Sequence, residues 1–199
     1  YTVIEKILEP GESLPADWAV DGTVGYEFNR VVGGLMVESD NRKAFAELYS
    51  RFIGGAISFH DLVYQSKMLI MRVALPSEVN VLALALDRLS EHHRRTRDFT
   101  FNGLRNAMRS IIASFPVYRS YIAAGRVSVD DLRHIEWAVA VAKKRSPAAD
   151  VSIFDFVKAV LTTQIAEGKN QAYRDRVWGF AMKFQQFTSP VMAKGLEDT

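Results

Sequence analysis

The side chains that could carry out chemistry in this chain are its carboxylates, its hydroxyls and four histidines, because it contains no cysteine. Without cysteine there is no thiolate nucleophile, no disulfide and no cysteine-based zinc site, as suits a cytoplasmic protein. No two histidines form the H-x-x-x-H or H-E-x-x-H spacing of a zinc-binding helix. The sequence therefore predicts no metal site and no cofactor; the histidines are His60, His92, His93 and His134.

One carboxylate is unusual in its position. Glu5 ends the stretch "YTVIE", an apolar run that reads as part of an extended segment from Tyr1 to Leu8. A soluble domain seldom opens in the middle of a strand, so we expect the chain to be part of something larger. By itself, a strand without neighbours has unpaired backbone groups on both sides and should be poorly anchored. An isolated carboxylate in such a place is ordinarily an exposed side chain.

The elements that would position Glu5 are mostly helices. Prolines and glycines between Glu9 and Gly25 predict a loop without regular structure. From about Asn41 apolar residues recur at spacings of three and four, which indicates an amphipathic helix that Gly54 and Gly55 end. The same spacing, with S-x-x-D caps at several starts, predicts more helices and so a helical bundle; they run from Ser58 to Pro76, Ser77 to His93, Thr100 to Phe115, Ser128 to Arg145, Ser152 to Gln164 and Tyr173 to Phe187.

Charge and hydropathy exclude several partners. The 25 Lys and Arg residues against 23 Asp and Glu give 199 residues a formal charge of only +2, too small to indicate nucleic acid or an anionic membrane. The basic run "EHHRRTR" lies at a helix end, where cations meet the helix dipole favourably. The longest apolar stretch, around Met68 to Leu75, is interrupted by Arg72 and is too short for a membrane span. We therefore expect neither a nucleic-acid nor a membrane partner.

Several irregular stretches, in the same order, closely resemble the maltooligosyl trehalose synthase family over essentially the whole chain. They are "VIEKILEPGESLPADWAVDGTVGYEF", "RDFT", "FPVYRSY", "RSPAADVSIFDF" and "FAMKFQQFTSPVMAKGLEDT". The family belongs to the α-amylase-like glycoside hydrolase clan, which is built on a (β/α)₈ barrel. The resemblance implies conversion of the reducing-end α-1,4 linkage of a maltooligosaccharide into an α,α-1,1 linkage, which is an isomerisation in trehalose biosynthesis.

The resemblance also implies a role for Glu5. In these enzymes the general acid/base is a carboxylic acid at the C-terminal end of the fifth barrel strand, which is the position of Glu5 after "YTVI". A retaining mechanism uses that acid to protonate the departing oxygen and then, as a base, to activate the acceptor hydroxyl. The family's nucleophile and third carboxylate belong to strands before and after this chain.

Two other residues are implied to bind substrate. Tyr26 follows a glycine turn and could stack on a sugar ring or be a core tyrosine, while Lys194 in "MAKGLEDT" could face the cleft or be a surface lysine. The family usually has threonine where this chain has Val24. Glu197 and Asp198 are expected to be structural partners; of the tryptophans, Trp137 and Trp178 are expected in the core, whereas Trp18 is left open.

The predicted organisation is a mainly α fold, a helical bundle inserted in the parent barrel. Its parts are residues 1–8 as a barrel strand, 9–40 as a loop and short helix of the sugar cleft, 41–184 as the helical insertion and 185–199 as the return to barrel and cleft. The expected partners are a maltooligosaccharide and the remainder of the parent barrel. The alternative is a non-catalytic helical carbohydrate-binding or interaction module; a nucleic-acid-binding bundle would require strongly salt-dependent binding.

Overall fold

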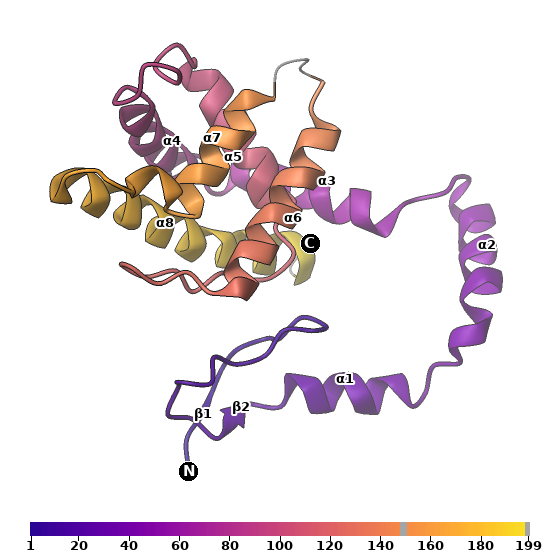
Figure 1. Ribbon diagram of the computed structural model, residues 1–199. Coiled ribbons are helices and arrows are strands. Elements are labelled where there is room, and N and C mark those ends of the chain that lie inside the picture. The colour runs from indigo at the N-terminus through magenta and orange to yellow at the C-terminus, as the bar shows by residue number, and fades with distance from the viewer. Residues whose placement is uncertain (148–150, 198–199) are drawn as a thin grey trace. The chain divides into compact units, whose positions relative to one another are not determined.

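The computed structural model describes residues 1–147 and 151–197, and the chain divides into two units whose elements are labelled in Figure 1. Unit 1 is Tyr1–Leu62 and unit 2 is Val63–Thr199. The predicted linker at residues 146–150 falls largely outside the described residues, as does Asp198. The described part is mainly helical with one short pair of strands, which confirms the expected fold class.

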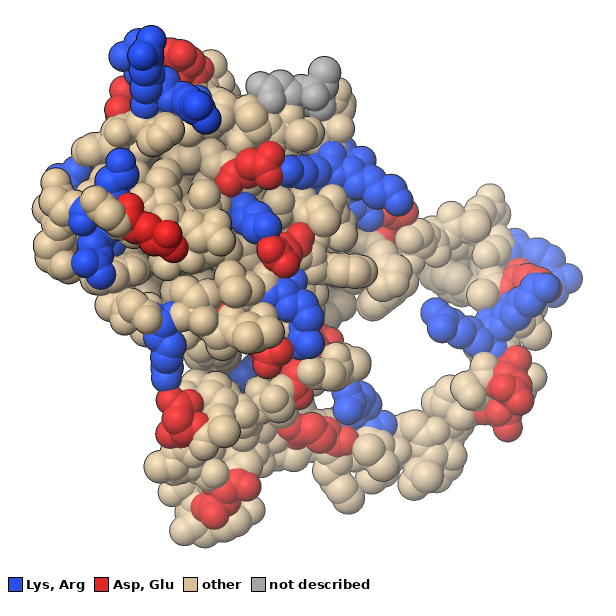
Figure 2. Space-filling view, in the orientation of Figure 1, with Lys and Arg blue, Asp and Glu red and all other residues tan. Residues whose placement is uncertain are grey.

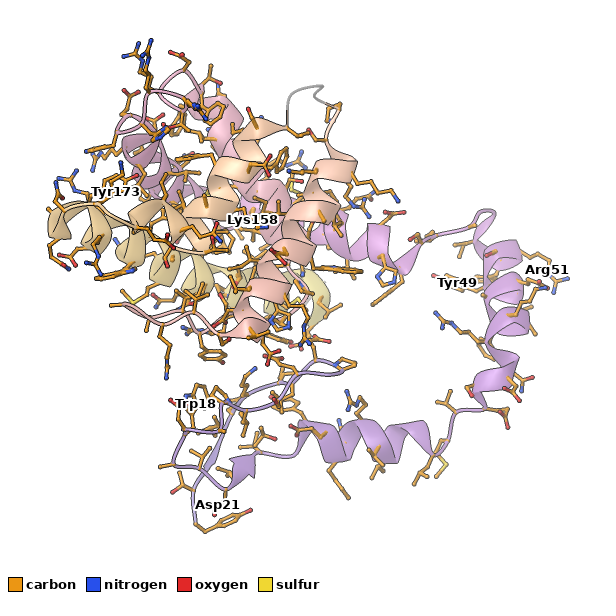
Figure 3. The ribbon with its side chains drawn as sticks, viewed as in Figure 1. Trp18, Asp21, Tyr49, Arg51, Lys158 and Tyr173 are labelled. Atoms are coloured by element: carbon orange, nitrogen blue, oxygen red, sulfur yellow. The ribbon has the colours of Figure 1, made fainter. Side chains whose placement is uncertain are left out.

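Unit 1 begins with two short strands that pair in parallel. Strand β1 (Val3–Ile4) lies beside β2 (Gly22–Thr23), with Val3 opposite Gly22 and Ile4 opposite Thr23. The prediction of an unpaired first strand followed by a structureless loop is therefore wrong. The loop returns the chain to β1 because Asp21, labelled in Figure 3, donates its backbone N–H to the Thr2 carbonyl oxygen at 2.7 Å. Its carboxylate accepts the Thr2 backbone N–H at 2.6 Å.

Two amphipathic helices complete unit 1 with η1 (Ser39–Asn41), a 3₁₀ turn. Helix α1 (Tyr26–Gly34) starts after Gly25, whose φ of 100° lies in the left-handed region that favours glycine. Helix α2 (Arg42–Ile53) ends before Gly54, as predicted, and carries Tyr49 and Arg51 on opposite sides (Figure 3). Neither helix has a buried residue, although both are amphipathic. Their apolar faces are therefore exposed to solvent.

Helix α3 (Phe59–Val73) begins in unit 1 and continues into unit 2, where the remaining helices follow. One proline lies where the sequence predicted a helix end, and a second lies just beyond the predicted end of the last helix at Phe187. Pro76 starts α4 at a position where proline is well tolerated, and Pro190 lies inside α8. The other elements agree with the prediction to within a few residues at most ends; the elements of unit 2 are α4 (Pro76–Ser90), α5 (Phe101–Ala113), α6 (Val129–Arg145), α7 (Ser152–Leu161), η2 (Gln164–Ala166), α8 (Gln171–Met192) and the π-helical η3 (Ala193–Glu197).

The core of unit 2 surrounds α5, which packs against α4, α6, α7 and α8. Leu104, Met108 and Ile111 of α5 are fully buried. Phe115 and Phe184 meet edge to face with ring centroids 5.9 Å apart. Each such buried side chain stabilises the fold by about 1.5–3 kcal/mol relative to its exposed state.

Two of the three predicted serine caps form, and at the start of α3 Ser58 Oγ accepts the Asp61 backbone N–H at 3.3 Å. Ser128 and Asp131 make a reciprocal capping box at the start of α6, and Asp131 also accepts the Tyr121 backbone N–H at 2.8 Å. At α7 the prediction is wrong, because Ser152 is already inside the helix and the preceding Val151 makes no side-chain cap. Asp155 instead forms an ion pair with Lys143 of α6.

Basic and acidic side chains are interspersed on the visible face of unit 2 and form no single basic field there (Figure 2). Within the described residues, no single helix is long and apolar enough to cross a membrane. The pair α3 and α4, bent by 90° at its break, passes that test by length and composition only.

Candidate functional site

The strand pair brings two of the predicted site residues together. Glu5 directly follows β1, and Tyr26 opens α1 shortly after β2. Because β1 and β2 are parallel, their carboxyl ends lie at the same edge. The Tyr26 hydroxyl donates a hydrogen bond to Glu5 Oε1 at 3.0 Å, and both side chains are exposed. The result is a carboxyl group whose orientation is held by a phenol.

A second carboxylate lies beside Tyr26 along the chain. Thr23 Oγ1 donates a hydrogen bond to Glu27 Oε2 at 2.5 Å. The Thr23 hydrogen bond is the main cause of a lowered Glu27 pKa. The Glu27 backbone N–H lowers that pKa further, desolvation opposes both, and the Arg30 and Lys6 cations add smaller lowering effects. Glu27 is therefore a carboxylate that stays ionised and donates no proton near neutral pH. Glu27 was not predicted as a site residue, and its place in the first helical turn was the available signal.

A buried ion pair fixes the chain just after Glu5. Lys6 Nζ lies 2.5 Å from Glu12 Oε1, and the two side chains are only 6% and 7% exposed. Glu12 Oε2 also accepts the Glu9 backbone N–H at 3.1 Å. Breaking one partner of such a buried pair is costly, so the turn is well defined. Glu5 is thus held between a paired strand and a buried ion pair, and the half-buried Trp18 lies further along the same loop (Figure 3).

The third predicted site residue, Lys194, belongs to unit 2 and is exposed in η3, directly after α8. Its neighbour Gly195 is buried against Lys67 of α3, which is 3% exposed and donates its Nζ proton to the Phe115 carbonyl oxygen at 3.0 Å. Two residues further on, Glu197 accepts a hydrogen bond from the Tyr118 hydroxyl. Glu197 thus has a hydrogen-bond partner within unit 2, in line with a structural role, and the segment carrying Lys194 is anchored beyond it.

Gly195 leaves no space for a side chain. A Cβ there would lie 2.7 Å from Lys67 Cγ and 2.9 Å from Lys67 Cα, and the second of these is backbone that cannot rotate away. We expect Gly195→Ala to lower the free energy of unfolding by about 1–3 kcal/mol, the usual cost of overpacking. Urea unfolding followed by circular dichroism measures it.

The matched control for that prediction is Gly179→Ala in α8, where a Cβ meets no atom within 4 Å. Alanine should raise stability there by about 0.8–1 kcal/mol, the difference in helix propensity. If both variants were equally stable, the close approach of Gly195 to Lys67 would be refuted.

The tryptophans differ from expectation. Trp137 is 61% exposed, so the prediction of a core position is wrong. The inward stripe of α6 includes Ile135, Ala138 and Ala142, and Trp137 lies outside it. Trp178 is half-buried, with the Arg174 guanidinium 5.0 Å from its ring centroid. Trp178 is therefore only partly in the core, as against the core position that was predicted.

No cluster of three or more histidines or carboxylates able to hold a metal ion occurs among residues 1–147 and 151–197. The chemistry that the Glu5 edge of unit 1 can perform is that of carboxyl and phenol groups. Proton transfer at Glu5, with its orientation set by Tyr26, is the most specific of these.

This architecture, a helical unit preceded by a short parallel strand pair, has counterparts among trehalose-synthesising enzymes. Two solved structures of maltooligosyltrehalose synthase from Arthrobacter ramosus, one of them a point mutant, are similar over 99% of this chain, with a TM-score of 0.77 and 25% identity. A solved glycosyltrehalose synthase is similar over 99% of the chain, with a TM-score of 0.64 and 24% identity. These structures confirm the resemblance expected from the sequence.

This chain spans only 22% of the length of the two Arthrobacter ramosus chains and 20% of the third. A scan against family models finds no match to the sequence, and neither does a search of curated proteins.

Proposed function

We propose that this chain is a segment of a maltooligosyl trehalose synthase, which converts the reducing-end α-1,4 linkage of a maltooligosaccharide into an α,α-1,1 linkage. The observation that carries the proposal is the structural similarity to maltooligosyltrehalose synthase over 99% of the chain. The net reaction is an isomerisation, because the glucose that leaves C1 of the neighbouring residue returns to it through its own anomeric hydroxyl.

In this proposal Glu5 is the general acid and base. As the glycosidic C–O bond breaks, Glu5 gives its proton to the departing oxygen, and a carboxylate outside this chain forms an ester bond to C1. The released glucose turns, and its anomeric hydroxyl attacks C1. Glu5 takes the proton of that hydroxyl while the ester carboxylate leaves, so Glu5 ends in its starting protonation state. Water must stay outside during this interval, or the ester would be hydrolysed.

Tyr26 and Lys194 contribute to binding in the same proposal. The Tyr26 hydroxyl, hydrogen-bonded to Glu5, sets the direction of the carboxyl group, and its ring offers a face on which a pyranose can stack. Lys194 would face the sugar cleft from the anchored η3 segment, where its ammonium group suits sugar hydroxyls. Each would lower the free energy of a correctly placed substrate.

The exposed apolar faces of unit 1 support the proposal of a larger parent. Phe28, Leu35 and Met36 are between 73% and 89% exposed, and on α2 Phe45 and Phe52 are 73% and 87% exposed. Soluble proteins rarely leave so many large apolar side chains in water along consecutive helices. We assign their cover to the remainder of the parent barrel. The chains of the relatives are several times longer than this one, which supports that assignment.

The proposed division of the parent follows from the same reasoning. Residues 1–8 would supply a barrel strand with Glu5, and residues 9–40 a loop and helix of the cleft. Residues 41–184 would form the helical insertion, and 185–199 would return to the barrel and cleft. The insertion would close the pocket against water.

The test uses the complete protein that carries this chain. Incubation with maltopentaose should remove reducing ends without release of free glucose, because both anomeric carbons become linked. Tyr26→Phe, which keeps the ring but removes the hydroxyl, should lower kcat about tenfold, the low end for a hydrogen bond to a charged group. KM should change little.

Tyr26→Ala is the companion variant, and it should raise KM as well because the stacking surface is lost. Unchanged reducing ends in the unmodified protein would overturn the proposed reaction. A normal kcat in Tyr26→Phe would remove only the orienting role of Tyr26.

A further inference from the structure

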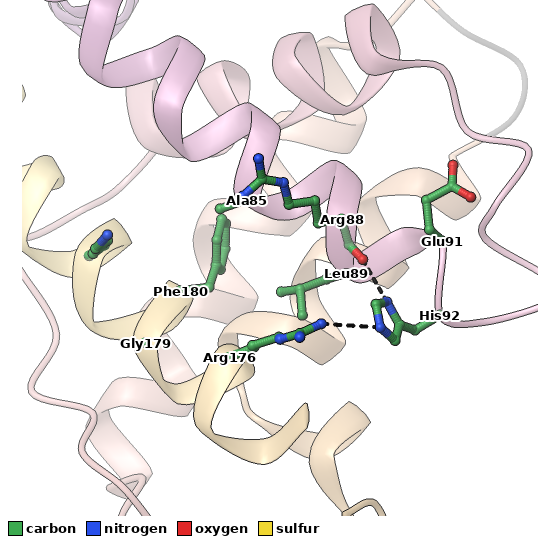
Figure 4. Close-up of a pocket in the computed structure, with 9 residues that line it drawn as sticks. Ala85, Arg88, Leu89, Glu91, His92, Arg176, Gly179 and Phe180 are labelled. Atoms are coloured by element: carbon green, nitrogen blue, oxygen red, sulfur yellow. Dashed lines mark hydrogen bonds between the residues drawn. The ribbon is translucent and has the colours of Figure 1, made fainter. Parts of the chain in front are cut away.

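A groove of about 570 Å³ lies in unit 2 between the C-terminal half of α4 and the middle of α8 (Figure 4). Nothing in the proposed reaction uses it. Its size is within the range of small-molecule sites. Its lining residues are Ala85, Arg88, Leu89, Glu91, His92, Arg176, Gly179, Phe180 and Lys183.

The charge of the groove is predominantly positive. Arg88, Arg176 and Lys183 line it, with Glu91 as the acidic lining residue. Elsewhere in unit 2 several cations are paired, as Lys158 is with Glu136 at 2.7 Å. Within the described residues, no carboxylate lies within ion-pair distance of any of these three cations. Three cations at one concave site attract an anion.

The His92 side chain orients one of these cations. His92 Nδ1 lies 2.7 Å from the Arg88 carbonyl oxygen, which can only accept, so Nδ1 carries the proton. Nε2 is then the acceptor for Arg176 Nη1 at 3.3 Å (Figure 4). The His92 ring packs against the buried Tyr173, with centroids 5.4 Å apart. Arg176 is thereby oriented without being neutralised, and its remaining N–H groups are available to a ligand.

The floor of the groove is apolar, and a glycine leaves space above it. Leu89 and Phe180 are 2% and 3% exposed and form its base. Gly179 lies inside α8, where glycine costs about 1 kcal/mol relative to alanine, and a Cβ there would meet no atom within 4 Å. Packing therefore does not require glycine at this position. The missing side chain leaves volume above Phe180.

We propose that this groove binds a phosphate dianion, either free or carried on a small sugar. Guanidinium groups match phosphate oxygens in paired hydrogen bonds, and the Lys183 ammonium adds a point charge. The apolar floor suits the face of a sugar ring. The inference is independent of Glu5 and of the proposed reaction, because it rests on residues of unit 2 alone.

The test is isothermal titration calorimetry of the complete protein at low salt with inorganic phosphate, glucose 6-phosphate and glucose. We expect both phosphates to bind with a Kd of about 1 mM or below and glucose not to bind at the same site. Tighter binding of glucose 6-phosphate would assign the sugar ester as the ligand, and equal binding would assign the phosphate alone. Either result supports the proposal.

Variants distinguish phosphate binding in the groove from non-specific attraction of phosphate by the positive charge of the protein surface. Arg176→Gln combined with Lys183→Gln should raise the Kd for phosphate at least tenfold, and Gly179→Leu should do so by filling the groove. Lys144→Gln combined with Lys169→Gln removes the same charge from exposed positions outside the groove and should leave Kd unchanged. Gly179→Ala should retain binding.

Circular dichroism of each variant confirms that it is folded. The proposal is overturned if neither phosphate binds at 10 mM, if the outer lysine pair weakens binding as much as the groove pair, or if Gly179→Leu binds normally.

Discussion

Glu5→Gln in the complete protein should lower the rate of α,α-1,1 linkage formation by about 10²–10⁴-fold, the usual contribution of a positioned general acid and base. The substitution tests proton transfer specifically, because the glutamine side-chain oxygen can still accept the hydrogen bond that the Tyr26 hydroxyl donates to Glu5 Oε1 at 3.0 Å. Geometry is kept and only the transferable proton is lost. Reducing-end assays on maltopentaose, with circular dichroism to confirm the fold, measure the effect.

Glu27→Gln is the comparison that makes this result specific. The Thr23 hydrogen bond lowers the pKa of Glu27 and keeps it ionised, so it does not act as the acid, and its loss should reduce the rate less than tenfold. If Glu27→Gln were the inactive variant and Glu5→Gln retained normal activity, the acid would have to be reassigned within unit 1.

The second large effect concerns the 199-residue chain by itself, which should not convert maltooligosaccharides. A retaining mechanism needs two carboxyl groups about 5 Å apart, and in our proposal the nucleophile lies outside this chain. Loss of one member of a catalytic set commonly costs about 10⁴–10⁶-fold in kcat. Because Tyr26 and Lys194 would line only part of a cleft, the affinity for maltopentaose should be no tighter than about 1 mM.

Incubation of the purified chain with maltopentaose, beside the complete protein at equal concentration, tests this expectation. A strongly helical circular dichroism spectrum shows that the chain is folded and the negative result meaningful. Sustained loss of reducing ends that Glu5→Gln abolishes would contradict the prediction, because a second carboxylate within this chain would then have to complete the site.

The sequence by itself determined most of the helices and the most important candidate residue. The capping box of Ser128 and Asp131 and the stop at Gly54 were readable because both act over a few neighbouring residues. The apolar spacing from Phe45 to Phe52 likewise predicted α2, since a helix repeats every 3.6 residues. Glu5 could be singled out from its place after an apolar strand and from the family resemblance.

The tertiary structure decided what depends on residues far apart in the chain. Val3 of β1 pairs with Gly22 of β2, 19 residues later, in a segment that was predicted to be a loop. This pairing places Glu5 and Tyr26 at the same edge, where they form a hydrogen bond. Trp137 was predicted in the core because helical periodicity shows that a helix has an apolar side. Periodicity does not show how much of that side the neighbouring helices cover, and Trp137 is exposed in the structure. Pro190 stays helical where Val191 and Met192 beyond it are buried, because packing outweighs the lost backbone hydrogen bond. Gly195 is required by Lys67, 128 residues earlier, since only a three-dimensional contact makes a Cβ impossible there.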